Sequence, residues 1–429
     1  MILSSSSTAQ ARFARGMLVA GILCLILWSR AASGAWWKGN LHTHTLWSDG
    51  DDFPEMVADW YKNHGYQFLG LSDHNLLQAG EKWVNATNVA GGPATLERYR
   101  ARFGAFWVTE AFHKGAVHVR LKTLEEFRPL LEERGRFLFI PATEITTQYK
   151  IWPVHVNGTN IRTPFKAPSG DSVLDAMQRC VDLVLQQREA TGQPMFPHIN
   201  HPNFGWAITA EDLSQLRGER FFEVYNGHPG TYSFGDGTRL AVEKIWDVAL
   251  ALRLSRTHLG PLYALAVDDS HRYHKFAPGE SNPGRGWIMV RAPRLEASEI
   301  VAAMERGDFY ATTGVRLADV RRESRRLTVQ VAVEPGVQYA IRFYGTPKGF
   351  DPSSEPILAK DGRPYPTTRR YGPEVGALLK EVQGPAGSYE LTGAELYVRA
   401  SIVSSKVKEH PQAAGEHERA WTQPLIAPP

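Results

Sequence analysis

The sequence predicts an α/β fold in which a seven-stranded barrel is followed by a small antiparallel β-domain. Between residues 38 and 269, seven short β-rich runs are separated mostly by helical or long connecting segments, a pattern typical of βα units. Histidines and carboxylates recur at or just past the ends of these runs. Side chains from many strand ends meet at one point only when the sheet closes. We therefore expect a parallel barrel rather than an open doubly wound sheet.

The expected strands are short runs of β-branched and apolar residues. They cover residues 38–43, 67–72, 136–143, 153–156, 195–200, 220–225 and 262–267. Helical spacing of apolar residues covers 53–65, 172–189 and 238–254, and Asp171 and Asp236 stand close to the start of the second and third helices. Most successive strands are thus separated by a helix or by a long connection.

The connection over residues 76–135 is long for a link between two strands. It contains many aromatic residues, among them Trp83, Tyr99 and Trp107, and a further helical pattern at 123–134. Long loops in compact domains are usually lids or binding loops, and this aromatic content argues against disorder. We expect a lid-like insertion that partly covers the functional site.

The character of the sequence changes after residue 314. Alternating and β-branched runs separated by Gly, Pro and Asp turns predict a β-sandwich-like domain over residues 315–405. Residues 406–429, rich in Ala, Pro and Glu, are expected to form a loose tail. Neither segment contains a cluster of candidate ligands, so we expect the chemistry to lie in residues 36–314.

The first 35 residues have the features of a secretory signal peptide. Arg12 and Arg15 precede a 12-residue apolar run at 17–28, and small residues at 33–35 offer a cleavage site. A membrane-spanning helix needs about 20 apolar residues, which makes the alternative, an uncleaved N-terminal anchor, the weaker interpretation. We expect an exported protein, periplasmic or extracellular, with no stable membrane insertion after cleavage.

Removal of this leader makes the chain electrically neutral. The full sequence has 48 basic and 45 acidic residues, and the leader carries Arg12, Arg15, Arg30 and no acidic residue, which leaves 45 of each. A neutral exported protein lacks the basic footprint of nucleic-acid-binding proteins, so we expect no nucleic-acid partner. Cys180 would be the only remaining thiol, which excludes an internal disulfide. The sequence leaves the oligomeric state open.

Nine potential metal ligands occupy the strand ends. They are His42, His44, Asp49, His74, Glu144, His155, His201, Asp269 and His271. Six histidines and three carboxylates exceed the roughly four ligands that one zinc ion binds. They suit two or three divalent ions that share a bridging carboxylate, and such a cluster can direct a hydroxide at an ester at neutral pH.

Two pairs of these ligands have the spacing of neighbours on one side of a strand. His42 and His44 are two residues apart, so their side chains project in the same direction and can bind one ion. Asp269 and His271 repeat this spacing, with Asp268 as the competing candidate for the carboxylate. Asp49 follows the first pair at loop distance.

Three further positions require a choice between neighbouring residues. Glu144 ends an otherwise apolar strand, where an unpaired charge is costly, so we expect it to meet a cation and to bridge two ions. Asp73 is expected to orient the imidazole of His74 rather than to bind an ion. His198 and His201, three residues apart, would face opposite sides of an extended strand, so we choose His201 as the ligand and His198 as its buried partner.

The ordered motifs resemble those of a known superfamily. Along the chain they are His42-x-His44, Asp49, Asp73-His74, Glu144, His155, His201-Pro202 and Asp269-x-His271. Over residues 38–320 this set resembles the polymerase and histidinol phosphatase (PHP) superfamily, which implies a distorted seven-stranded β/α barrel with two or three metal ions. The resemblance assigns His42, His44, Glu144 and Asp269 to a first ion, Glu144, His155 and His201 to a second, and Asp49, His74 and His271 to a third.

Other segments resemble an exported branch of this superfamily that is named after carbaryl-type ester hydrolases. These segments are residues 223–229, 245–247, 307–314 and 420–424. The resemblance then extends into the β-domain and covers nearly the whole mature chain. It leaves the substrate open, because the superfamily includes phosphatases, nucleases and carboxyl-ester hydrolases.

We therefore expect a metal-dependent hydrolase in which two or three divalent ions (zinc, manganese or iron) direct a bound hydroxide at a small-molecule phosphoester. One alternative is a carboxylic or carbamate ester cleaved at the same site, and a second is an inactive module that only holds metal. Asn226 and His228 are the candidate substrate contacts, and His228 is also the candidate proton donor, although both residues could instead belong to a structural turn.

Overall fold

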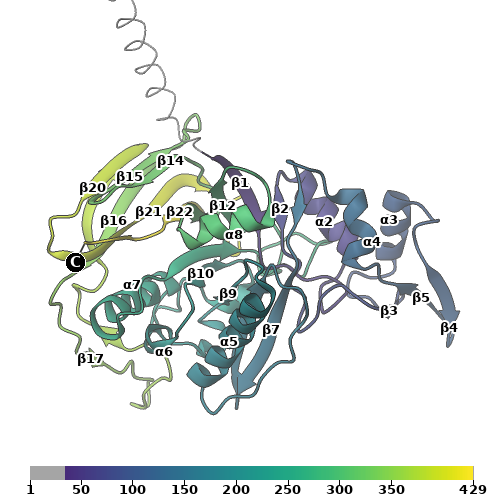
Figure 1. Cartoon of the computed structure of the whole chain (residues 1–429), viewed down its shortest axis with the longest axis horizontal. Helices are drawn as coiled ribbons and strands as arrows, with labels where there is room; N and C mark the ends of the chain where they lie inside the picture. The colour runs from purple at the N-terminus through teal and green to yellow at the C-terminus, as the bar shows by residue number, and fades with distance from the viewer. Residues whose placement is uncertain (1–33, 429) are drawn as a thin grey trace, which may run out of the picture.

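A computed structural model describes residues 34–428 and shows a mixed α/β fold built from several sheets (Figure 1). One ten-stranded sheet has the order β19 (Ala377–Gln383), β16 (Tyr339–Pro347), β21 (Glu395–Val407), β22 (His417–Thr422), β13 (Phe309–Thr312), β12 (Trp287–Ala292), β1 (Ala35–Asn40), β2 (Phe68–Leu69) and β6 (Leu138–Phe139), with β23 (Leu425–Ile426) paired to β21. A five-stranded sheet has the order β11 (Tyr263–Val267), β10 (Phe221–Asn226), β9 (Phe196–Ile199), β8 (Trp152–Thr159) and β7 (Ala142–Tyr149).

Each of the seven expected runs overlaps a strand, but the strands are divided between these two sheets. Two isolated parallel bridges, Thr43 to Ser270 and His74 to Glu144, connect the sheets where the strands end. Backbone hydrogen bonds support both bridges, with 3.0 Å from His44 N to Ser270 O and 2.8 Å from Asn75 N to Glu144 O. The strand ends therefore surround one region of the molecule, which is the region that carries the candidate ligands.

The expectation that the strands of this region are all parallel is wrong for β8, which runs antiparallel to both of its neighbours, whereas β9 pairs parallel with β10. β7 and β8 pair antiparallel up to Tyr149 and Trp152, and a two-residue turn with Lys150 at a φ of 54° joins them. β8 also pairs antiparallel with β9. A parallel pair needs a crossover of roughly a dozen residues or more, which this turn cannot provide. The strand continues through the polar residues 146–149, which the sequence pattern did not assign to a strand.

Most of the helices pack on the outer faces of the two main sheets, and two lie in the segment 76–135 (Figure 1). The helices are α2 (Pro54–Asn63), α3 (Ala94–Phe103), α4 (Leu124–Leu131), α5 (Val173–Thr191), α6 (Ala210–Gln215), α7 (Val242–Leu252) and α8 (Ala297–Glu305), with short turns η1 (Phe204–Trp206), η2 (Pro229–Thr231) and η3 (Arg253–Thr257). The hydroxyl of Ser172, rather than Asp171, caps α5 by accepting from Asp175 N. Met177, Cys180 and Val181 of α5 are buried in the core beside the five-stranded sheet. No helix of the described residues is long and apolar enough to cross a membrane.

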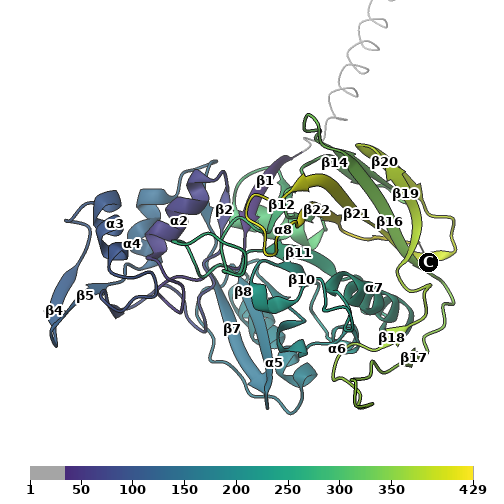
Figure 2. The same cartoon turned by 180° about the vertical axis from the view of Figure 1, so that it is seen from behind.

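Residues 76–135 form a separate arm at one side of the molecule, as both views show (Figures 1 and 2). It contains α3, α4 and a three-stranded sheet of β3 (Trp83–Asn85), β5 (Ala116–Arg120) and β4 (Glu110–His113). The ring of Tyr99 stacks on Phe53 with centroids 4.1 Å apart, and this contact belongs to a core shared with Leu46 and Trp47. The arm therefore packs behind the loop that carries His44 and Asp49.

The region after residue 315 is joined to the rest of the chain by a shared sheet. Its own three-stranded sheet contains β14 (Leu317–Arg322), β15 (Arg326–Val331) and β20 (Ala386–Glu390), and β17 (Ser354–Glu355) pairs with β18 (Arg370–Tyr371). β22 pairs with β13, so strands of the two expected domains join edge to edge in the ten-stranded sheet. A buried ion pair adds to this contact, with 2.7 Å from Arg399 Nε to Asp247 Oδ1 and 2.6 Å from Nη2 to Oδ2.

The prediction of a loose tail over residues 406–429 is wrong. β22 lies between β13 and β21, and Trp421 is only 1% exposed. The polar and proline-containing residues that suggested a tail lie mostly in the loop 408–416 between β21 and β22, whereas Ala420 and Trp421 enter the core. The expected signal peptide falls almost entirely outside the described residues.

The buried position of Trp421 gives a test of this arrangement. We expect Trp421→Ala to lower the free energy of unfolding by about 3–5 kcal/mol, because it leaves a large cavity in the shared sheet. The exposed His417 of the same strand is the control, and His417→Ala should change stability by less than about 0.5 kcal/mol. Urea unfolding of both variants provides the measurement, and equal stability of the two would mean that the segment is loose.

Candidate metal centre

The nine predicted ligands lie in one cluster at the ends of the strands. His42 and His44 follow β1, His74 follows β2, Glu144 and His155 lie on β7 and β8, His201 follows β9, and Asp269 and His271 follow β11. Asp49 comes from the turn after His44. Ligand atoms of His44, Asp49, His74 and His271 lie within 4.8 Å of one another, as do those of three smaller sets drawn from the same nine residues. Residues up to 229 positions apart thus meet in one site.

The side chains assigned to the first ion have the spacing of a metal coordination sphere. They are His42, His44, Glu144 and Asp269. Nε2 of His42 and Nε2 of His44 each lie 3.2 Å from Asp269 Oδ1. Each of these nitrogens is also 3.4 Å from a carboxylate oxygen of Glu144. Four ligands at about 2.1 Å from a tetrahedral ion are separated by about 3.4 Å. These four side chains can therefore hold one ion with little movement.

Glu144 belongs to a second set as well. Its Oε1 lies 2.9 Å from His155 Nδ1 and 3.5 Å from His201 Nε2. These three residues form a group with mutually close ligand atoms. A carboxylate placed between two histidine groups has the position of a bridge between two ions.

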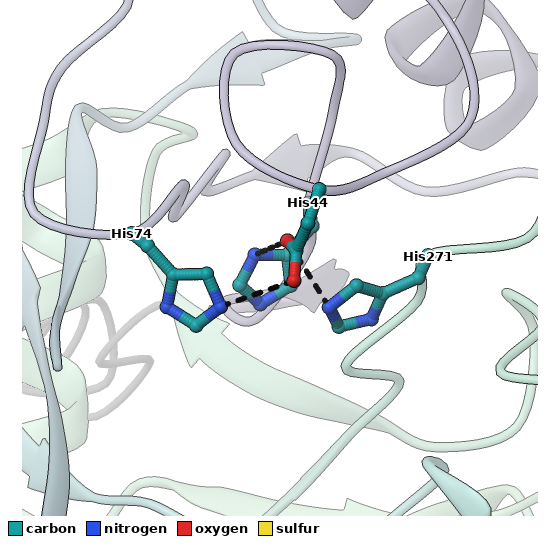
Figure 3. A group of neighbouring side chains, drawn as sticks. His44, His74 and His271 are labelled. Atoms are coloured by element: carbon teal, nitrogen blue, oxygen red, sulfur yellow. Dashed lines mark ion pairs between the residues drawn. The ribbon is translucent and has the colours of Figure 1, made fainter. Parts of the chain in front are cut away.

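Asp49 is the centre of the third set. Figure 3 shows His44, His74 and His271 gathered from separate segments of the chain. Each of these imidazoles has a ring nitrogen 3.4 Å from an Asp49 oxygen. The side chain of Asp49 is 54% exposed, so this set is the most accessible to solvent.

Several buried atoms of the cluster have no hydrogen-bond partner. His42 Nε2, His44 Nε2, Glu144 Oε2 and His155 Nδ1 are all in this condition. Buried polar atoms are nearly always paired, so a group of unpaired atoms that face one another needs an explanation. Imidazole and carboxylate ligands fit divalent zinc, manganese or iron, which would satisfy these atoms.

The electrostatics of the cluster lead to the same conclusion. Burial alone would raise the pKa of Glu144, but the charges of His155 and His42 outweigh it and hold this pKa well below its usual range. Burial would lower the pKa of His42, yet Asp269 and Glu223 raise it well above its usual value. The buried carboxylates thus require positive charge, and divalent ions can supply it while the histidines stay neutral.

Glu223 on β10 is the main supporting residue that the sequence did not reveal. Its Oε1 lies 2.6 Å from His42 Nδ1 and 3.2 Å from His198 Nε2, and its Oε2 accepts from His201 N at 2.7 Å. A carboxylate on the far nitrogen of a ligating histidine fixes the orientation of the ring. The signal was a single acid in an apolar strand, the same signal that identified Glu144.

Asp73 does not play the predicted role. It accepts hydrogen bonds from Thr45 N at 2.8 Å and from the Ser48 hydroxyl at 2.6 Å, and none of its hydrogen bonds involves His74. His74 Nδ1 instead lies 2.5 Å from the hydroxyl of Thr146. Asp73 therefore fixes the loop between His44 and Asp49, because the strand end turns its side chain away from the neighbouring imidazole.

The structure also shows which of Asp268 and Asp269 faces the ligand cluster. Asp268 accepts from the backbone nitrogens of residues 284, 285 and 286 and from the Tyr61 hydroxyl, so its oxygens are fully used away from the cluster. Asp269 faces His42 and His44 and has a φ of 49°. Strained backbone of this kind is common at functional sites.

Asn226 and His228 differ in their access to the site. Asn226 is 1% exposed and donates to Glu223 Oε2 at 2.8 Å and to Asp269 Oδ2 at 3.1 Å. Its predicted role as a substrate contact is therefore corrected, because it supports the ligands from behind. His228 lies on the wall of the cavity above the cluster, with its ring centroid 5.5 Å from that of His271.

This cavity has a volume of about 150 Å³. Its wall is formed by Asp49, His74, Glu144, His155, His201, Phe204, His228, Thr231, Asp269 and His271. Among the described residues, no residue of the arm 76–135 and no lysine or arginine lines this cavity. A larger groove of about 910 Å³ between α5 and η3 is lined by none of the nine ligands, so we place the chemistry in the smaller cavity.

Comparisons with protein-family models and with curated proteins found no match. Among solved structures, a two-domain protein from Bacteroides vulgatus containing a predicted PHP-like metal-dependent phosphoesterase has a TM-score of 0.40 and 14% identity, over 91% of this chain and 96% of that chain. A candidate metal-dependent phosphoesterase from Bifidobacterium adolescentis has a TM-score of 0.28 and 12% identity, over 56% and 90%. An amidohydrolase from Chromobacterium violaceum has a TM-score of 0.27 and 17% identity, over 55% and 87%. At these values the function has to be argued from the site itself.

The position of Glu144 predicts the effect of its replacement. Glu144→Gln keeps the shape but removes the charge shared by two ligand sets, so the bound metal should fall by at least one ion per chain. Elemental analysis after dialysis measures this number. Full metal content in the variant would remove Glu144 from the centre.

Glu223 allows a matched comparison with another buried glutamate of the same region. We expect Glu223→Gln to weaken metal affinity by about 10–100-fold, because His42 loses the carboxylate that orients it. Glu219 lies near the start of β10 and accepts from the backbone nitrogens of Arg220 and Phe221. Burial raises its pKa well above the usual value, so Glu219→Gln should leave metal affinity unchanged. Equal metal titrations of the two variants would contradict the role of Glu223.

Proposed function

We propose that this chain is a metal-dependent hydrolase of the PHP type that cleaves small-molecule phosphoesters. The observation that supports this most strongly is the shared Glu144, which lies between two histidine groups whose facing atoms are buried and unpaired. Two or three divalent ions held there would activate water and stabilise negative charge on the ester oxygens. Two of the ligand sets implied by the PHP resemblance, Glu144 with His155 and His201 and Asp49 with His74 and His271, have mutually close ligand atoms, which supports the proposal.

The protein residues prepare this chemistry in three ways. Burial, followed by the charge of His271, lowers the pKa of His44 to about 4, so its imidazole is neutral at pH 7 and available as a ligand. Glu223 and Asn226 hold His42 and Asp269 in fixed orientations. The small cavity is walled by ligands of the cluster together with Phe204, His228 and Thr231. Fixed ligands and a small cavity limit the geometries in which an ester can approach.

His228 is our candidate for the proton donor. Gly230 N donates to His228 Nδ1 at 3.2 Å, so in the neutral ring the proton is on Nε2. Burial lowers the pKa of His228, which favours this neutral form. In this form Nε2 can donate a hydrogen bond to an oxygen of the substrate, whereas proton transfer to the leaving oxygen would require the ring to take up a second proton on Nδ1 first.

The alternative substrate is a carboxylic or carbamate ester. It is favoured by the absence of lysine and arginine from the cavity wall within the described residues, since a doubly charged phosphomonoester usually meets such cations. Among phosphoesters, the same observation favours diesters over monoesters. The alternative of an inactive metal-holding module finds no support, because all nine positions carry a side chain that can bind metal. Export to the periplasm or the exterior remains part of the proposal on the strength of the leader sequence.

A substrate panel under metal control tests the function. We expect hydrolysis of bis-p-nitrophenyl phosphate to be abolished by a chelator and restored by manganese or zinc. As pH falls through about 6.5, protons compete with metal for the histidines, so activity should be present at neutral pH and lost below about pH 6. Cleavage of p-nitrophenyl acetate alone would assign the site to carboxyl esters. Hydrolysis that resists the chelator for every active substrate would contradict the mechanism.

A further inference from the structure

The loop 408–416, between β21 and β22, lies against the cavity loop that carries His228. Gln412 Nε2 donates to the main-chain oxygen of His228 at 2.5 Å. The loop itself is held in place, because Glu416 Oε2 accepts from Gln412 N at 2.8 Å and Glu416 Oε1 accepts from Lys408 Nζ at 2.8 Å. Lys408 also donates to the Tyr225 hydroxyl at 2.6 Å, on the strand that leads into the cavity loop.

Arg285 strengthens the same contact from beneath. It is fully buried and donates to Gly227 O at 2.9 Å and to Pro411 O at 3.1 Å. It thereby joins the residue before His228 to the residue before Gln412. A Cβ on Gly227 would lie 2.8 Å from both Arg285 Cβ and Asp268 O, so this close approach requires glycine.

The other restraints on His228 come from within its own loop. Asn226 Oδ1 accepts from His228 N at 2.8 Å, and the Thr231 hydroxyl donates to His228 O at 2.7 Å. The start of the turn is also held to the site, because Asn226 Nδ2 donates to Glu223 and Asp269 and Gly227 N donates to Val267 O at 3.0 Å. The bonds from Gln412 and Arg285 add a second attachment, from the side of the loop 408–416.

We propose that the loop 408–416 is a positioning element of the site, with Gln412 as the positioning residue that fixes the His228 turn against the ligand cluster. This inference rests on the proposed hydrolase function only for its effect on turnover. Through Gln412, a segment at the far end of the chain controls the direction of the candidate proton donor. It supplies no ligand itself, so metal binding should not depend on it.

The test compares three variants of the full chain. Gln412→Met keeps the length of the side chain and removes the donor, and Gln412→Lys restores a donor. Gln423→Met is the matched control, because Gln423 Nε2 also donates to a buried main-chain oxygen, that of Ala264 at 2.9 Å, away from the His228 turn. Amide hydrogen exchange of residues 226–231 is measured in the metal-free protein. Metal content, kcat and KM are measured after reconstitution with manganese.

We expect exchange of residues 226–231 to become about tenfold faster in Gln412→Met, with kcat about tenfold lower, KM within about twofold and metal content unchanged. Gln412→Lys should recover most of both losses, and Gln423→Met should show neither. Unchanged exchange in Gln412→Met, loss of metal in that variant, or an equal effect of Gln423→Met would overturn the proposal. If the wild-type protein hydrolyses no ester, the proposed function fails, and the exchange measurement alone decides whether Gln412 fixes the turn.

Discussion

The structure depends on the need to balance three carboxylates within a cluster of six imidazoles. Glu144 and Asp269 are buried, and with Glu223 their charges raise the pKa of His42 well above its usual value against the opposing effect of burial. Charge at such density costs free energy unless cations are placed among it. Divalent ions meet this requirement and also satisfy the unpaired nitrogens and oxygens. The same constraint that calls for metal thus prepares a site for ester hydrolysis.

The surrounding fold holds these groups at fixed positions. The two main sheets meet through two bridges. One is at Thr43, which follows the ligand His42, and the other is at the ligand His74. Behind them, Glu223 and Asn226 supply hydrogen bonds to the ligands, and Asp73 fixes the loop of Asp49. β22 joins the two halves of the shared sheet, and the loop before it contacts the turn that carries His228. Stability and site geometry therefore depend on segments from the whole described chain.

The sequence predicted the candidate site better than the fold around it. Ligand types and strand ends follow from local patterns, so His42, His44 and Glu144 could be located by their spacing and by the cost of an isolated charge. The antiparallel β7–β8 hairpin and the central position of β22 depend on pairing between distant strands, which composition does not reveal. Glu223 was missed because its partner His42 is 181 positions away. A carboxylate inside an apolar strand was nevertheless a usable signal.

The central claim is that Glu144 joins two ions in one centre. Anomalous X-ray scattering from crystals of the protein reconstituted with manganese tests it most directly. We expect at least two peaks, each within about 2.5 Å of a Glu144 oxygen and surrounded by the histidines of the two sets. A single peak bound only by Asp49 and its neighbours, or no peak near Glu144 at full metal loading, would contradict it.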